Sequence, residues 1–294
     1  MTLHERLVEA RARLVAAGIR PDEAAIDADL YARTILGWDR ARLLADRQQP
    51  APPELEPRFS EWIRRRERRE PTAYITGRRE FWGLEFEVTP AVLIPRPETE
   101  FIVEEALALL SGGLTPSGDP AAANVADIGT GSGCVAVAIA HACAGCQIVA
   151  TDISREALAV ARRNAARHGV ADRINFVETS YLTGVDGPFA LVTANPPYVK
   201  DGARPILGAD VRHEPEVALF GGPEGLRDIA GVLDAAIGAL EAGGWLVMEF
   251  GYGQDDEVEA LVAARQELAL VRVRQDLQGI SRTAIMQRGP RRAR

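Results

Sequence analysis

The stretch Val125-Ala-Asp-Ile-Gly-Thr-Gly-Ser-Gly-Cys134 decides the fold of this 294-residue chain. Residues 125–129 form a short apolar run typical of a buried strand, and residues 134–144 have the composition of an apolar helix. Gly129, Gly131 and Gly133 lie between them, so the backbone can turn tightly and approach a ligand without side-chain clashes. Free N–H groups at the start of a helix favour an anion or a polar group. The sequence therefore predicts a strand, a ligand-binding turn and a helix.

The same alternation continues toward the C-terminus. Strands are predicted at residues 147–153, 173–178, 189–194 and 245–251, with helices at 156–168, 229–240 and 256–264. Two further apolar runs, near residues 268–276 and 283–288, end the chain. Repeating strand–helix units predict an α/β fold, a Rossmann-like parallel sheet with helices on both faces.

The region before this sheet has a different pattern. Apolar residues recur at helical spacing through about residue 70, and we expect helices beginning near Leu3, at Pro21 and from Pro53 to Arg69. Alternation in Leu84-Glu-Phe-Glu-Val88 predicts a short hairpin. We therefore expect a helical domain at residues 1–79, a hairpin linker at 80–95 and a catalytic domain at 96–294. Residues 111–124, rich in Gly, Pro and Ser, are predicted to form a surface loop.

Composition excludes several classes of protein. The formal net charge is -8, which disfavours a protein that grips nucleic acid mainly through phosphates. Three cysteines do not suggest a disulfide framework, and Cys143 and Cys146 lack a second pair of metal ligands, so we expect no metal and a reducing cytoplasm. Residues 128–151 contain no charged side chain, but a buried turn, helix and strand explain them better than a membrane span. The charged N-terminus is no signal peptide.

Asp152 and the tetrapeptide Asn195-Pro-Pro-Tyr198 mark two further parts of a site. Asp152 ends the second predicted strand, where a carboxylate suits the two ribose hydroxyls of an adenosine ligand. The tetrapeptide follows another strand directly. The tetrapeptide could instead be a plain proline turn, and the glycine loop could belong to another nucleotide-binding fold.

The tetrapeptide has the chemistry needed to bind a planar NH₂ group. Such a nitrogen is a poor nucleophile because its lone pair is delocalised. The Asn195 side-chain oxygen and the Pro196 carbonyl could accept both of its hydrogens and stabilise positive charge as it develops. Tyr198 could cover the group and exclude water. Positioning would then supply most of the acceleration.

Together the glycine turn, Asp152 and the tetrapeptide resemble class I methyltransferases that act on exocyclic or amide nitrogens. More specifically, the chain resembles the release factor glutamine methyltransferase family (PrmC/HemK) over about residues 71–288. The motifs that carry this resemblance are Pro71-Thr-Ala-Tyr-Ile-Thr-Gly77, Glu80-Phe-Trp-Gly-Leu84, Leu93-Ile-Pro-Arg-Pro-Glu-Thr-Glu100, Asp210-Val-Arg-His-Glu-Pro215, Glu249-Phe-Gly-Tyr-Gly-Gln254 and Asp276-Leu-Gln-Gly-Ile280.

The resemblance implies S-adenosyl-L-methionine as cofactor and class I peptide chain release factors as substrate, methylated on the N5 nitrogen of the Gly-Gly-Gln glutamine. It also implies a helical N-terminal domain that docks this substrate. We expect a monomer without stable nucleic acid or membrane partners. Ser180-Tyr181 replace the usual acidic and aromatic pair, and Tyr181 is carried over beside the adenine. The implied cofactor-binding residues are Gly129, Thr130, Gly131, Ser132, Gly133, Asp152, Tyr181 and Asn195, and the implied catalytic residues are Asn195, Pro196, Pro197 and Tyr198.

Three alternatives remain open at this point. One is a glutamine methyltransferase of a ribosomal protein, another an N6-adenine nucleic-acid methyltransferase, and the third a non-catalytic binding protein on the same fold. The basic run within residues 64–69 reads as a solvated helix face or as a docking surface for an acidic partner. Residues 201–226 read as a lid or as a plain surface loop.

Overall fold

The computed structural model describes residues 1–112 and 123–289. Contacts divide the chain into two compact units: Met1–Arg78 with Gly208–His213, and Arg79–Leu207 with Glu214–Arg294. No sequence pattern predicted that residues 208–213 join the N-terminal helices rather than the catalytic region. Most of the loop predicted at 111–124 lies outside the described residues.

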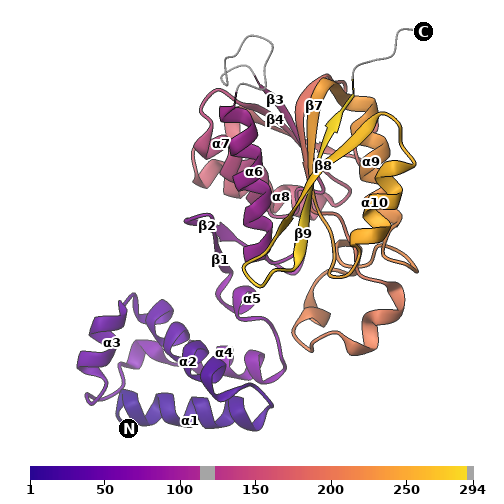
Figure 1. Cartoon of the computed structure of the whole chain (residues 1–294). Helices are drawn as coiled ribbons and strands as arrows, with labels where there is room; N and C mark the ends of the chain where they lie inside the picture. The colour runs from indigo at the N-terminus through magenta and orange to yellow at the C-terminus, as the bar shows by residue number, and fades with distance from the viewer. Residues whose placement is uncertain (113–122, 290–294) are drawn as a thin grey trace. The chain divides into compact units, whose positions relative to one another are not determined.

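The first unit is built from helices (Figure 1). They are α1 (Leu3–Ala16), α2 (Pro21–Leu36), α3 (Arg40–Asp46), η1 (Pro53–Leu55), α4 (Arg58–Glu67) and α5 (Thr72–Thr76). Thr2 and Glu5 form a capping box at the start of α1, and Pro21 occupies the first turn of α2. The predicted helical region is confirmed. The prediction of a single helix from Pro53 to Arg69 is wrong. The short helix η1 ends at Leu55, and α4 begins only at Arg58, after Pro57.

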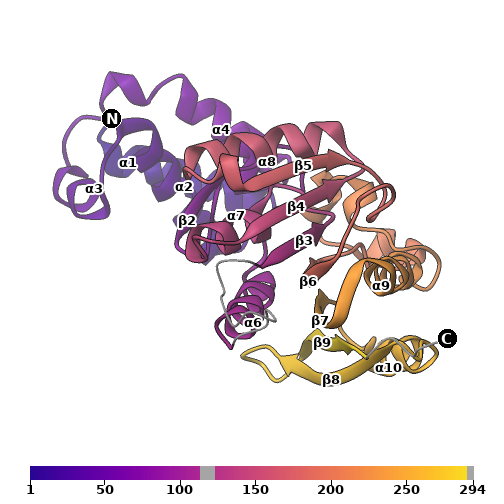
Figure 2. The same cartoon turned by 90° about the horizontal axis from the view of Figure 1, so that it is seen from above.

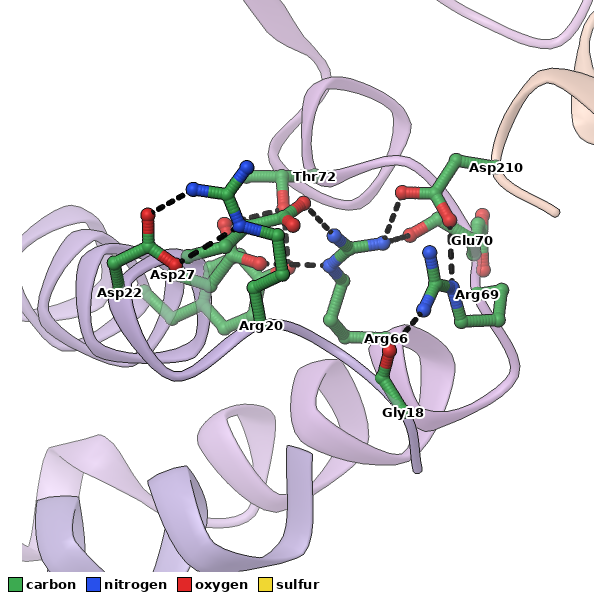
Figure 3. Close-up of polar contacts among 11 residues, drawn as sticks. Gly18, Arg20, Asp22, Asp27, Arg66, Arg69, Glu70, Thr72 and Asp210 are labelled. Carbon is green, nitrogen blue, oxygen red and sulfur yellow. Dashed lines mark hydrogen bonds and ion pairs between the residues drawn. The ribbon is translucent and has the colours of Figure 1, made fainter. Parts of the chain in front are cut away.

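Arg66 lies at the centre of a buried polar network in this unit (Figure 3). Its guanidinium donates to Asp27 Oδ2 at 2.7 Å and to Asp210 Oδ2 at 2.7 Å, and it also pairs with Glu23. Arg69 donates to the second oxygen of Asp210 at 2.7 Å. Arg66 of α4 and Arg69, just beyond the end of that helix, thus hold one carboxylate, and this contact joins residues 208–213 to the helices.

The network corrects one sequence-based interpretation. A basic run was expected to be a solvated helix face or a docking surface. Only 2% of the Arg66 side chain is exposed, and Arg65 pairs with Glu70. Arg64 and Arg68 are the exposed members of the run. The solvated-face interpretation is therefore wrong for Arg66, because sequence spacing alone does not show which carboxylates another helix and a distant segment bring to it.

The second unit is a seven-stranded sheet in the order β5-β4-β3-β6-β7-β9-β8. Its strands are β3 (Asn124–Ile128), β4 (Gln147–Asp152), β5 (Ile174–Glu178), β6 (Phe189–Ala194), β7 (Leu240–Glu249), β8 (Leu268–Gln275) and β9 (Ser281–Arg288). Figure 2 shows α6 (Glu100–Ser111), α7 (Cys134–Ala142) and α8 (Arg155–Arg167) on one face, and α9 (Arg227–Ala239) and α10 (Asp255–Ala263) on the other. Each layer encloses its own apolar cluster, and the predicted α/β fold is confirmed.

The repeating units predicted a parallel sheet, but the observed sheet is mixed. Strands β5, β4, β3, β6 and β7 are parallel, but β9 is antiparallel to both of its neighbours. The reason is local. Asp276 accepts the N–H groups of Gln278 and Ile280 in a tight turn, so β8 and β9 form a hairpin and must run in opposite directions.

The predicted hairpin consists of β1 (Arg78–Phe81) and β2 (Leu84–Glu87). Trp82 and Gly83 connect the strands with φ values of 55° and 70°, as a two-residue hairpin turn requires. Phe81 and Phe86 are buried in the cluster beneath α7. The hairpin is therefore part of the packing of the second unit rather than a free connection.

Two expectations about residues 128–151 have different outcomes. Cys143 and Cys146 were not expected to form a disulfide, but the structure joins them. The short turn between α7 and β4 brings their Cα atoms to 5.6 Å, within the range for a disulfide. Across residues 1–112 and 123–289, no helix is long and apolar enough to cross a bilayer.

Candidate active site

Three strand ends meet at one edge of the sheet. The register places Ile128, the last residue of β3, beside Thr151 of β4 and Ala194 of β6. Gly129 and Asn195 directly follow two of these residues. Because the strands are parallel, their carboxyl ends form the edge at which open α/β sheets bind ligands.

A cavity opens at this edge and gathers most of the predicted site residues. Its wall includes Gly129, Thr130, Gly131, Ser132, Asp152, Tyr181, Asn195, Pro196 and Pro197. Gly133 and Tyr198 are not part of this wall. The cavity also has apolar residues, among them Ile128, Val135 and Val232, so one side suits a flat apolar group.

The glycine turn has the backbone conformation that its sequence predicted. Gly129, Gly131 and Gly133 have φ values of 69°, 54° and 81°, which side chains rarely tolerate. Gly133 is the N-cap of α7, and a Cβ added to it would lie 3.0 Å from the Cβ of Ala161 on α8. Gly133 therefore permits close helix packing, and Gly129 and Gly131 face the cavity.

Asp152 is held in place by backbone donors. Gly131 N–H donates to Oδ2 and Ser154 N–H to Oδ1, each at 2.9 Å. Burial raises the pKa of Asp152, and the backbone donors oppose that rise. Each carboxylate oxygen keeps a further lone pair, so the side chain can still accept from ligand hydroxyls.

Tyr181 lines the cavity with its backbone fixed at a φ of 51°. Thr151 Oγ1 donates to its carbonyl at 2.7 Å, and its own hydroxyl donates to Asp228 Oδ1 at 2.8 Å. A Cβ added to Gly231 would lie 2.3 Å from the Tyr181 ring. The sequence pointed to Tyr181 but missed Asp228 and Gly231, the two residues of α9 that fix the ring.

Asn195 belongs to a hydrogen-bond chain at the base of the cavity. Its Nδ2 donates to Thr99 Oγ1 at 3.0 Å, and Thr99 Oγ1 donates to Glu249 Oε2 at 2.7 Å. The Tyr198 hydroxyl donates to the other oxygen, Glu249 Oε1, at 3.0 Å. Tyr198 was expected to cover the substrate. Its hydroxyl is directed to this buried carboxylate, because a buried phenol needs a hydrogen-bond partner, and coverage of the substrate by its ring stays a prediction.

Comparisons with known proteins agree with this arrangement. A family model described as the PrmC N-terminal domain matches residues 5–77, and one described as the methyltransferase small domain matches residues 103–211. A release factor glutamine methyltransferase of Moorella thermoacetica is 41% identical over 270 residues, 90% of each chain. The chain belongs to the release factor glutamine methyltransferase family.

Further relatives support family membership and the fold. A release factor glutamine methyltransferase of Bradyrhizobium diazoefficiens is 38% identical over 287 residues, 96% of this chain and 95% of that protein. A methyltransferase from Pyrococcus furiosus matches in fold with a TM-score of 0.52 and 19% identity, over 70% of this chain and 90% of that one. This protein is thus a methyltransferase, and S-adenosylmethionine is its methyl donor.

The cavity fits that cofactor on evidence of its own. Asp127 Oδ2, Thr130 Oγ1 and Ser132 Oγ are buried and have no hydrogen-bond partner among the described residues. Buried polar atoms are normally paired, so three orphans around one turn indicate a polar ligand there. Burial raises the pKa of Asp127 to about 6, against the hydrogen bond that Thr193 Oγ1 donates to Oδ1 at 2.8 Å. Asp127 was not among the site residues predicted from the sequence.

A buried carboxylate also fixes the far wall of the cavity. Glu214 accepts a hydrogen bond from Ile94 N–H at 3.1 Å and pairs with Arg96. Val217 and Ala218, just beyond it, line the cavity. Part of the predicted segment 201–226 is therefore cavity wall, held by the Arg96 motif that identified the family.

The residues missed by sequence reasoning share a recognisable signal. Thr99, Arg96, Glu214 and Glu249 lie in the motifs that carry the family resemblance, but no chemical role had been assigned to them. Glu249 is the clearest, since it is a carboxylate at the end of the apolar run Leu246-Val-Met-Glu-Phe250. An acidic residue at the carboxyl end of a buried strand can be found from sequence alone.

Proposed function

We propose that this protein methylates the N5 amide nitrogen of the glutamine in the Gly-Gly-Gln motif of class I peptide chain release factors. Its relatives are named release factor glutamine methyltransferases and match most of its length. The observation that carries the proposal is the side chain of Asn195 at the cavity wall, whose NH₂ group donates to Thr99. Its oxygen is left to accept from the NH₂ group of a substrate amide.

The residues of the site would act mainly by positioning. We infer that the Asn195 oxygen and the Pro196 carbonyl accept the two hydrogens of the glutamine amide and aim its nitrogen. As positive charge develops on that nitrogen, the two acceptors stabilise it. When bound, the cofactor supplies a methyl group on a positively charged sulfur. The two acceptors would hold the nitrogen toward that methyl group, and the methylated nitrogen would then release one proton to water.

The segment after Pro197 supports this geometry through close backbone packing. A Cβ added to Gly221 would lie 2.4 Å from the Pro197 carbonyl oxygen, and one added to Gly225 would lie 2.2 Å from that of Tyr198. Only glycines fit these approaches. The glycines therefore keep the tetrapeptide rigid, which matters because a shift of about 1 Å in a reacting group can cost about 100-fold in rate.

We also propose that residues 1–79 dock the release factor, as the family resemblance implies. Action as a monomer in the cytoplasm, without stable nucleic acid, remains a prediction. The exposed arginines Arg64 and Arg68 are the candidates for contact with an acidic partner. Arg66 is not, because it is committed to carboxylates of its own unit.

Mass spectrometry tests the proposed substrate directly. A purified release factor is incubated with this protein and S-adenosylmethionine, digested and sequenced. We expect one added methyl group, on the Gly-Gly-Gln glutamine. Methylation absent there but present on a ribosomal-protein glutamine, or on adenine, would replace the proposed substrate with that one.

Asn195→Ala tests whether the site is catalytic. We expect methylation to fall at least about 100-fold, because one of two acceptors for developing charge is lost. The dissociation constant for the cofactor should change much less. Asn175→Ala, at an exposed position of β5, is the matched control and should keep full activity. Equal losses of cofactor binding and activity in Asn195→Ala would contradict a role in catalysis.

A further inference from the structure

We propose that Thr99 and Glu249 are positioning residues that set the orientation of the Asn195 amide, so that its oxygen and not its NH₂ group faces the substrate. This inference rests on the proposed function. Neither residue touches the substrate amide in the scheme above. Both act through Asn195, and Glu249, whose two oxygens both accept hydrogen bonds, determines the direction of every hydrogen bond in the chain.

The carboxylate is the fixed end of this chain. Glu249 is 1% exposed and Thr99 is 3% exposed, so water does not offer them alternative partners. The Thr99 and Tyr198 hydroxyls both donate to Glu249, one to each oxygen, so both oxygens of this side chain act as acceptors. Burial raises the pKa of Glu249, and these two donors oppose that rise.

Direction then passes from Glu249 to Asn195. A threonine hydroxyl has one hydrogen, and Thr99 gives it to Glu249. The Thr99 oxygen is consequently an acceptor toward Asn195, and the Asn195 NH₂ group must face it at 3.0 Å. The side-chain amide of asparagine has nearly the same shape when flipped, so shape alone does not choose between the two orientations.

A reversed chain would disable the site. If Thr99 donated to Asn195, the NH₂ group of Asn195 would turn away from Thr99 and meet the substrate. Two NH₂ groups cannot hydrogen-bond through their hydrogens, and the substrate nitrogen would lose an acceptor. A carboxylate that acts on Asn195 through Thr99 thus selects for an NH₂ donor in the substrate.

Valine and serine at position 99 separate this role from simple packing. Thr99→Val keeps the size of the side chain but can neither accept from Asn195 nor donate to Glu249, and Thr99→Ser keeps both hydrogen bonds. With a release factor as substrate, we expect kcat to fall at least about 10-fold in Thr99→Val. It should stay within about threefold of wild type in Thr99→Ser, with the cofactor dissociation constant unchanged in both. Thr99→Val with wild-type kcat would overturn the inference.

Glu249→Leu carries the test if Thr99→Val does not fold. Leucine cannot accept a hydrogen bond, so the Thr99 hydroxyl is free to donate to Asn195 and the direction of the chain is no longer fixed. We expect a loss of kcat similar to that of Thr99→Val, with the cofactor dissociation constant retained. Wild-type kcat in Glu249→Leu would overturn the role of the carboxylate. Wild-type protein is measured in parallel: its failure to methylate the release factor would refute the proposed function instead.

Discussion

Replacing Arg66 by Met should destabilise the first unit strongly, although methionine is apolar and of similar length. The guanidinium is buried and pairs with Glu23, Asp27 and Asp210 (Figure 3). Glu23 and Asp210 have side chains that are 41% and 28% exposed, so water can replace much of what they lose. Asp27 has a side chain that is 6% exposed, and it would remain as a buried charge.

The cost can be estimated from these exposures. Removing one partner of a buried ion pair costs about 3–5 kcal/mol. Asp27 keeps one hydrogen bond, donated by the Thr72 hydroxyl at 2.7 Å, which favours the lower end of that range. We expect the first unit to lose about 3 kcal/mol of stability, which corresponds to roughly 150-fold faster amide exchange through unfolding of the unit.

Hydrogen exchange followed by mass spectrometry measures the change in stability of each unit separately. Peptides from α2 and α4 should exchange faster in Arg66→Met, and peptides from the sheet should not. Arg64→Met, at an exposed position of the same helix, is the control and should change little. Adding Asp27→Asn to Arg66→Met should recover part of the loss, since the stranded charge is then removed. No recovery would refute the assignment of the cost to Asp27.

Two further predictions concern the cofactor cavity. Burial raises the pKa of Asp127 to about 6, so the folded state binds more protons than the unfolded state between about pH 4 and 6. As the pH rises through this window, the free energy of unfolding of wild type should therefore fall by up to about 3 kcal/mol relative to that of Asp127→Asn. A difference between the two proteins that is independent of pH in denaturant titrations would contradict this. Gly231→Ala should weaken cofactor binding at least about 10-fold in calorimetry, since its Cβ would lie 2.3 Å from the Tyr181 ring and displace it. Gly238→Ala in the same helix has open space around it and should bind normally, and equal affinity in both variants would exclude the steric explanation.

Some elements were predictable because their cause is local. The glycine turn requires positive φ values at three positions, and the sequence shows three glycines there. Asp152 and Asn195 follow from their places at strand ends, where parallel strands bring them to one edge. The β8–β9 hairpin was missed as an antiparallel element, because periodicity shows a strand but not the direction of its neighbour.

The chain's own sequence determined the α/β fold, the helical N-terminal region, the ligand-binding edge and the family, because these depend on periodicity and on motifs that are continuous in the chain. Only the tertiary structure decided what the isolated polar residues do. Arg66 meets Asp210 across 144 positions, and Thr99 meets Glu249 across 150. The same arginine could stand on a solvated helix face or in a buried network. Burial and partners choose between them, and both arise only when distant segments pack together.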